Sequence, residues 1–167
     1  MISLREESPE VFYAEGELIS VGPDEIAKLK QMAAQTPRRR CRICFHSNPA
    51  GGLHEMLIVH EKNAWVPPHM HIGKSESIQV VEGSALLVCF SEDGEIESSV
   101  RIGDGGHVFC RLSEEKFHTL LIDSEWLVFK ETILGPFDPL STKLAPWAPK
   151  ISGKEADYFI EELRSQI

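Results

Sequence analysis

Long apolar segments are missing from this chain of 167 residues. A helix needs about 20 consecutive apolar residues to cross a bilayer, and no stretch of the sequence approaches that length. The first residues, 1–7, include Arg5, Glu6 and Glu7, where a secretory signal would need an apolar run. We therefore expect a cytoplasmic protein with no membrane partner.

Basic residues are few compared with acidic ones. The chain has 17 lysines and arginines against 26 aspartates and glutamates, which gives a net charge of -9. A nucleic acid or an anionic membrane surface would repel a protein with this charge. We therefore expect neither to be a partner.

Cysteines are also few, and their spacing does not complete a zinc site. The four are Cys41, Cys44, Cys89 and Cys110, so the single C-x-x-C has no second pair to complement it. Residues three apart on a strand point to opposite faces, and we expect a strand here. In the cytosol these side chains should be ordinary reduced thiols.

The sequence predicts short strands between two helices, in one domain over 1–167. The first helix is expected over 23–35, where Pro23 occupies the first turn, and the second over 153–166. Between them, apolar residues alternate with polar ones over about 38–135, and Asp-Gly and Gly-rich turns separate the runs. This pattern indicates an all-β barrel or sandwich. The expected strands include 75–82, 84–91, 95–102, 107–111, 117–122 and 126–133.

The most informative segment is Pro67 to Glu76. His69 and His71 are two residues apart in extended chain, so their side chains share one face, with Cβ atoms about 6.5–7 Å apart. Two imidazoles can converge from there on one ion with bonds of roughly 2.1 Å. A bend at Gly73 would let Glu76 face the same point from the next strand, and His118 could add a third imidazole.

Three imidazoles and one carboxylate suit a divalent transition metal, namely Fe, Mn, Zn, Ni, Co or Cu. This donor set leaves coordination positions open on an octahedral ion. Open positions allow a substrate or O₂ to bind, whereas a closed tetrahedral site would be structural. The pattern thus predicts one metal ion that takes part in binding or chemistry.

These residues resemble a known family motif. The pattern H-x-H-x4-E-x6-G, formed by His69, His71, Glu76 and Gly83, resembles the first motif of the cupin superfamily. Of the second motif, G-x5-P-x-G-x2-H-x3-N, only His118 matches. Its proline, glycine and asparagine are replaced by Ser113, Glu115 and Ile122. The resemblance implies a mainly β fold, the cupin double-stranded β-helix or jelly-roll barrel, and a homodimer, because cupins commonly pair through edge strands.

A narrower resemblance covers roughly residues 38–149. The order of short motifs is similar to that of the WbuC family of cupin fold metalloproteins, whose members are named for a bacterial O-antigen gene cluster. The motifs are Arg40-Cys41-Arg42 with His46, Glu55 to Ile58, Pro68 to His71, Glu76-Ser77, Arg111-Leu112 with His118-Thr119, Gly135-Pro136 and Ala145 to Pro149.

A second group of residues is predicted to contact a substrate. His46 shares strand parity with Arg40, Arg42 and Cys44. If this face turns into the barrel mouth, Arg42 and His46 could bind an anionic substrate, since arginine holds carboxylates and phosphates with two parallel hydrogen bonds. Lys74 could line the entrance. The alternative is a solvated basic face, and we expect His54, His60 and His107 to be ordinary surface or core residues.

Three functions are compatible with these features. The first is a metal-dependent isomerase or epimerase acting on a small polar molecule, such as a sugar or sugar nucleotide of bacterial surface polysaccharide metabolism. In that reaction His46 would be the catalytic base and Arg42 would orient the substrate. The second is an Fe(II)-dependent dioxygenase. The third is a module that binds a metal or small ligand without catalysis.

Overall fold

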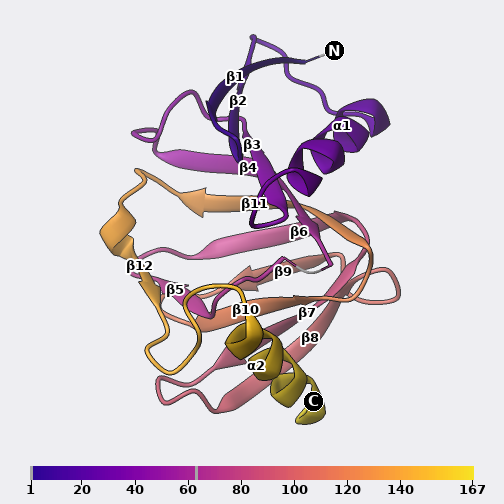
Figure 1. Ribbon diagram of the computed structural model, residues 1–167. Coiled ribbons are helices and arrows are strands. Elements are labelled where there is room, and N and C mark those ends of the chain that lie inside the picture. Colours follow the sequence, from indigo (N-terminus) through magenta and orange to yellow (C-terminus); the bar gives the residue numbers. More distant parts are fainter. Residues whose placement is uncertain (1, 63) are drawn as a thin grey trace.

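The computed structural model describes residues 2–62 and 64–167, which form two facing β-sheets with a helix on the outside of each (Figure 1). The larger sheet has the strand order β1-β2-β3-β4-β11-β6-β9, and the smaller has the order β12-β5-β10-β7-β8. The larger sheet contains β1 (Ser3–Ser8), β2 (Val11–Glu15), β3 (Arg40–Cys44), β4 (Leu53–Glu61), β11 (Trp126–Leu134), β6 (Glu76–Glu82) and β9 (Phe109–Leu112). The smaller contains β12 (Thr142–Leu144), β5 (His69–His71), β10 (Phe117–Ile122), β7 (Ser84–Phe90) and β8 (Ile96–Gly103).

The chain passes repeatedly from one sheet to the other between β4 and β11, which is the jelly-roll connection. Most neighbouring strands are antiparallel, and β2 with β3 is a parallel pair. The predicted mainly β jelly roll with an N-terminal and a C-terminal helix is therefore confirmed. Tight turns allow the crossings: Gly83 has φ +82°, and a Cβ there would lie 2.0 Å from the carbonyl oxygen of Trp126.

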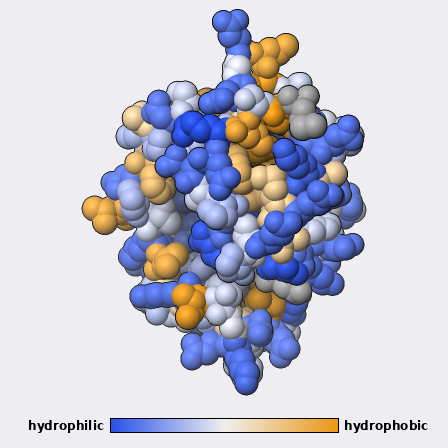
Figure 2. All heavy atoms as spheres, turned by 45° about the horizontal axis from the view of Figure 1, so that its top comes forward, coloured by the Kyte–Doolittle hydropathy of each residue, from blue (hydrophilic) through white to orange (hydrophobic). Residues whose placement is uncertain are grey.

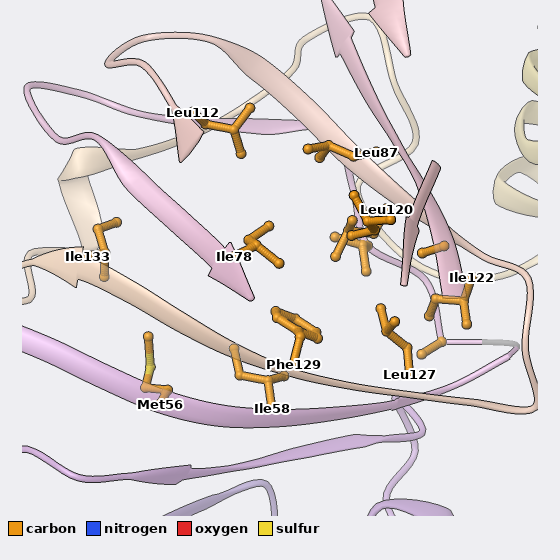
Figure 3. Close-up of a cluster of buried hydrophobic side chains, with 14 of the residues drawn as sticks. Met56, Ile58, Ile78, Leu87, Leu112, Leu120, Ile122, Leu127, Phe129 and Ile133 are labelled. Carbon is orange, nitrogen blue, oxygen red and sulfur yellow. The ribbon is translucent and has the colours of Figure 1, made fainter. Parts of the chain in front are cut away.

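The main hydrophobic core lies between the two sheets. In Figure 3, Ile78 and Phe129 of the larger sheet point toward Leu87 and Leu120 of the smaller one. All four side chains are buried, as expected from the two-residue alternation of apolar positions along each strand. Some of these core residues, among them Ile78, Leu120 and Phe129, also line the cavity described below.

The helices cover the outer faces of the sheets. Helix α1 (Pro23–Ala34) packs Leu29 and Ala33 against Cys41 and other outward residues of β3 and β4. Helix α2 (Lys154–Ser165) covers the smaller sheet, where Leu163 joins a third cluster. Both helices match the predicted spans within one residue at each end.

The two cysteines of the C-x-x-C lie on opposite faces of β3, in agreement with their spacing. Cys41 belongs to the cluster under α1, and Cys44 belongs to the core between the sheets. Burial raises the pKa of Cys41 to about 12, so its thiol is protonated at neutral pH. All four cysteines are free thiols.

Two features were not predicted. The hairpin of β1 and β2 extends the larger sheet beyond β3. A short strand, β12, and the 3-10 helix η1 (Pro139–Ser141) lie between the two proline-containing segments near the C-terminus. Strand β12 pairs with β5 and so borders the histidine motif.

None of the helices formed by residues 2–62 and 64–167 is long and apolar enough to cross a membrane. Hydrophilic residues dominate the face shown in Figure 2, with hydrophobic residues exposed between them in small groups.

Candidate metal centre

Three histidines converge from neighbouring strands of the smaller sheet. His69 and His71 lie at the two ends of β5 on one face, and His118 of β10 is the direct cross-strand neighbour of His69. The ring centroids of His69 and His118 are 4.5 Å apart, and those of His69 and His71 are 5.1 Å apart. One ring nitrogen from each residue lies within 4.8 Å of the others, a separation that one metal ion can span.

Glu76 reaches the same point from the larger sheet. The chain turns at Gly73, which has φ +67°, and enters β6 at Glu76. The Glu76 carboxylate is 4% exposed, with one oxygen 2.8 Å from Nε2 of His118 and the other 3.6 Å from Nε2 of His71. The predicted bend and the predicted convergence of these side chains are both present.

The other ring nitrogen of each histidine has a partner of its own. Nδ1 of His69 lies 2.9 Å from the carbonyl oxygen of Pro67, and Nδ1 of His118 lies 2.9 Å from that of Lys116. Nδ1 of His71 lies 3.2 Å from the hydroxyl oxygen of Thr142. A carbonyl accepts only from N–H, so it fixes a proton on Nδ1 of His69 and of His118 and leaves Nε2 as the nitrogen that can bind a metal ion. In the metal-free protein Nε2 of His118 donates to Glu76, and a metal ion would take the place of that proton. The donor set therefore fits a transition-metal ion.

The electrostatics of the cluster agree with that role. Burial, and then the positive charge of His118, lower the pKa of His69 to about 3, and burial also lowers the pKa of His71. Burial opposes the charged forms of His118 and Glu76, but their hydrogen bond and mutual attraction outweigh it. The pKa of His118 is raised and that of Glu76 is lowered. Glu76 is thus favoured as an anion and His69 and His71 as neutral imidazoles, as metal binding requires, whereas a metal ion would have to displace the proton that His118 donates to Glu76.

The cluster opens into a cavity of about 630 Å³ between the sheets. Arg42, His46 and Lys74, which the sequence singled out, all line this cavity. The polar face of β3 therefore turns inward rather than into solvent. His54 and His60, which we expected to be ordinary surface or core residues, are buried and line this cavity, and so does Glu131.

Strand register shows how these residues are arranged across the larger sheet. Glu76 of β6 pairs with Ile133 of β11, which pairs in turn with His54 of β4. His46 continues this row on the far side of His54, since the two rings stack with centroids 3.9 Å apart. His46 is thus three strands, or roughly 14 Å, from Glu76 along the sheet. It would contact a substrate bound at the histidine cluster only if that substrate spans the cavity.

His46 and Lys74 differ in their surroundings. Nδ1 of His46 lies 3.3 Å from the carbonyl oxygen of Glu55, and burial followed by the neighbouring His54 lowers the pKa of His46. The imidazole is therefore neutral near pH 7. The Lys74 ammonium donates to the carbonyl oxygen of Pro136 at the cavity entrance.

Glu131 is the functional candidate that sequence reasoning missed. It lies on β11 between Phe129 and Ile133 of the same face, directly opposite Ile78 and Met56. Burial, and then the charge of Glu76, raise the pKa of Glu131 to about 7. An acidic residue within an apolar alternation was the signal available in the sequence, and an ionisable group with a strongly shifted pKa in a cavity is often functional.

Comparisons with known proteins place the fold. A protein family described as a domain of unknown function (DUF6016) matches residues 21–102. The capsular polysaccharide assembling protein CapF from Staphylococcus aureus is similar in structure, with a TM-score of 0.55 and 17% identity over 65% of this chain. CapF with the inhibitor 3-isopropenyl-tropolone gives a TM-score of 0.56 and 17% identity over 66%.

Oxalate decarboxylase from Bacillus subtilis at pH 4.6 is also similar, with a TM-score of 0.50 and 19% identity over 63% of this chain. The chain spans 32% of CapF and 27% of the decarboxylase. No curated protein matches the sequence. These structural likenesses establish that the chain has a cupin fold.

Proposed function

We propose that this protein is a cupin metalloprotein that binds one divalent transition-metal ion through His69, His71, His118 and Glu76. The observation that carries the proposal is the convergence of three imidazoles and one carboxylate in a cavity, with every Nδ1 held by another group. A structural zinc site would be closed, whereas this cluster opens into space for a ligand.

The proposed reaction is an isomerisation or epimerisation of a small polar substrate. A divalent ion in this cluster would polarise a carbonyl or hold neighbouring hydroxyl oxygens. Arg42 would orient the substrate by its guanidinium, and Lys74 would attract it at the entrance. His46, neutral at pH 7, would exchange a proton with the part of the substrate that reaches the far end of the cavity.

We infer that the substrate is a sugar or sugar nucleotide of bacterial surface polysaccharide metabolism. The motif order that resembles the WbuC family supports this inference, as does the structural likeness to a protein described as assembling capsular polysaccharide. The proposal includes a single domain over 1–167, a cytoplasmic location and a homodimer.

Metal analysis combined with a turnover assay tests the proposal. Protein purified without added metal should contain about one transition-metal ion per chain, and a panel of sugar nucleotides should include one that it converts. Oxygen consumption with Fe(II) but not with Zn(II) would identify a dioxygenase instead. Tight binding without conversion would identify a binding module, and a protein that takes up no metal would contradict the proposal.

A further inference from the structure

The cavity has a second polar end, opposite the histidine cluster. Arg42 of β3 is the cross-strand neighbour of Ile58, and His60 of β4 is the neighbour of Arg40. Both Arg42 and His60 line the cavity, three and two strands away from β6, which carries Glu76. We call Arg42 and His60 the distal site.

The distal site contains buried polar atoms that have no hydrogen-bond partner among residues 2–62 and 64–167. His60 is 5% exposed, and its Nδ1 has no hydrogen-bond partner among the described residues. The same holds for the buried Nε of Arg42. Burying polar groups without partners costs free energy, so such groups usually have a partner or bind a ligand. Two unpartnered polar atoms that line one cavity, one of them the N–H donor of Arg42, therefore indicate a ligand group that accepts hydrogen bonds.

Arg42 also differs from the two neighbouring arginines, Arg38 and Arg40, in its ion pairing. Arg38 and Arg40 both pair with Glu10. Within residues 2–62 and 64–167, Arg42 makes no such pair. Burial, and then Arg40 and Arg42, lower the pKa of His60 to about 3, so His60 is neutral and the guanidinium supplies the charge.

The charge of the cavity differs from that of the whole protein. The chain carries a net charge of -9, yet cationic side chains outnumber acidic ones among the residues that line the cavity. The cations are Arg38, Arg40, Arg42, Lys74 and Lys150, and the acids are Glu7, Glu10, Glu76 and Glu131. A cavity with this balance favours an anionic ligand over a neutral one.

We propose that the distal site binds the acidic group of the ligand, so the ligand is a hydroxylated acid whose oxygen-rich opposite end lies at the histidine cluster. A carboxylate and a phosphate share the required chemistry, because a guanidinium holds either with two parallel hydrogen bonds. The strands that carry Arg42 and Glu76 are roughly 14 Å apart, and both side chains reach inward. The remaining space suits a molecule the size of a sugar acid or sugar phosphate. This inference rests on the proposed metal site.

Isothermal titration calorimetry with three related sugars tests the proposal. The probes are D-glucuronate, D-glucose 6-phosphate and neutral D-glucose, each titrated into metal-loaded protein. We expect at least one acidic sugar to bind about tenfold or more tightly than glucose, and the tighter of the two identifies the acidic group. Arg42→Gln should remove this preference and leave the metal content unchanged, whereas Arg42→Lys should keep part of it.

A matched control separates a local contact from a general charge effect. Arg111 is exposed on β9 and does not line the cavity, so Arg111→Gln removes the same charge at a distance and should leave every affinity unchanged. Equal affinities for all three sugars, no saturable binding of either acid, or an acid preference that survives in Arg42→Gln would each overturn the proposal. If the protein holds no metal, the proposed function fails. The Arg42 dependence of inorganic phosphate binding to the metal-free protein then still decides the distal site.

Discussion

The two ends of the cavity satisfy their polar groups in different ways. At the histidine cluster, each Nδ1 atom has a partner within the protein, and Nε2 of His71 and of His118 lie close to Glu76. At the distal site, Nε of Arg42 and Nδ1 of His60 have no partner among the described residues. The first arrangement is preorganised for a compact ion that needs fixed lone pairs. The second suits a larger group that brings its own acceptors.

The largest effect should come from removing two ligands together. His69→Ala with His71→Ala should reduce the metal content from about one ion per chain to nearly none, because two of the three imidazoles are lost. Elemental analysis measures this. His107→Ala, at an exposed position outside the cavity, is the matched control and should keep the metal. Metal retained in the double variant would contradict the site assignment.

A smaller effect should follow from removing the hydrogen-bond partner that orients one of the imidazoles. Thr142→Val removes the hydroxyl beside Nδ1 of His71, and the metal affinity should fall by about 10–100-fold. A chelator competition assay measures this change. Thr142→Ser keeps the hydroxyl and should retain the affinity. Phosphate binding at the distal site should be unaffected, so a parallel loss there would show that the two ends are not separate.

Glu131 lies on β11, between the strands that carry the two ends of the cavity. Its buried carboxyl group should lower the free energy of unfolding when it is ionised. Its pKa is about 7 in the folded protein and 4.5 in the unfolded chain. Between these two pH values the folded state therefore keeps a proton that the unfolded state loses. The stability associated with this proton is fully present below about pH 4.5 and is lost as the pH rises through 7. Glu131→Gln should therefore stabilise the metal-free protein by about 1–3 kcal/mol at pH 8 and by less at pH 5.

Urea unfolding at the two pH values measures this difference. Glu161→Gln, at an exposed position on α2, should change the stability little at either pH. A stabilisation of Glu131→Gln that does not depend on pH would show that the carboxyl group does not titrate in this range.

The smallest effect is expected at Lys74. This partly buried side chain lines the cavity and already donates to the carbonyl oxygen of Pro136, so we expect it to contribute to the attraction of anions more than to their final contacts. Lys74→Ala should change the affinity for an acidic sugar by less than about threefold, and increasing salt should abolish the difference. A loss as large as that of Arg42→Gln would place the acidic group near the entrance instead.

The two ends also differ in how far they could be predicted from the sequence. The histidine motif is contiguous, so strand parity and the bend at Gly73 were enough to bring His69, His71 and Glu76 together. The alternation of side chains along an extended chain also predicted that Arg42 and His46 face the same side. It could not show that this face turns inward, because that depends on α1 covering the other face.

The residues that were missed depend on contacts between distant segments. His60 and Glu131 face the cavity because β4 pairs with both β3 and β11, and alternation within one strand does not reveal its neighbours. The hairpin of β1 and β2 was missed for a similar reason. Its half-polar strands are ordered by pairing with β3, which follows helix α1 in the chain.

The contact between His71 and Thr142 has a consequence for the biosynthesis of the protein. The two residues are 71 positions apart, and Thr142 is supplied by β12, near the C-terminus. A nascent chain would present His69, His71 and Glu76 long before the strand that orients His71 has been made. We therefore expect full metal affinity to arise only after β12 has been synthesised and has paired with β5.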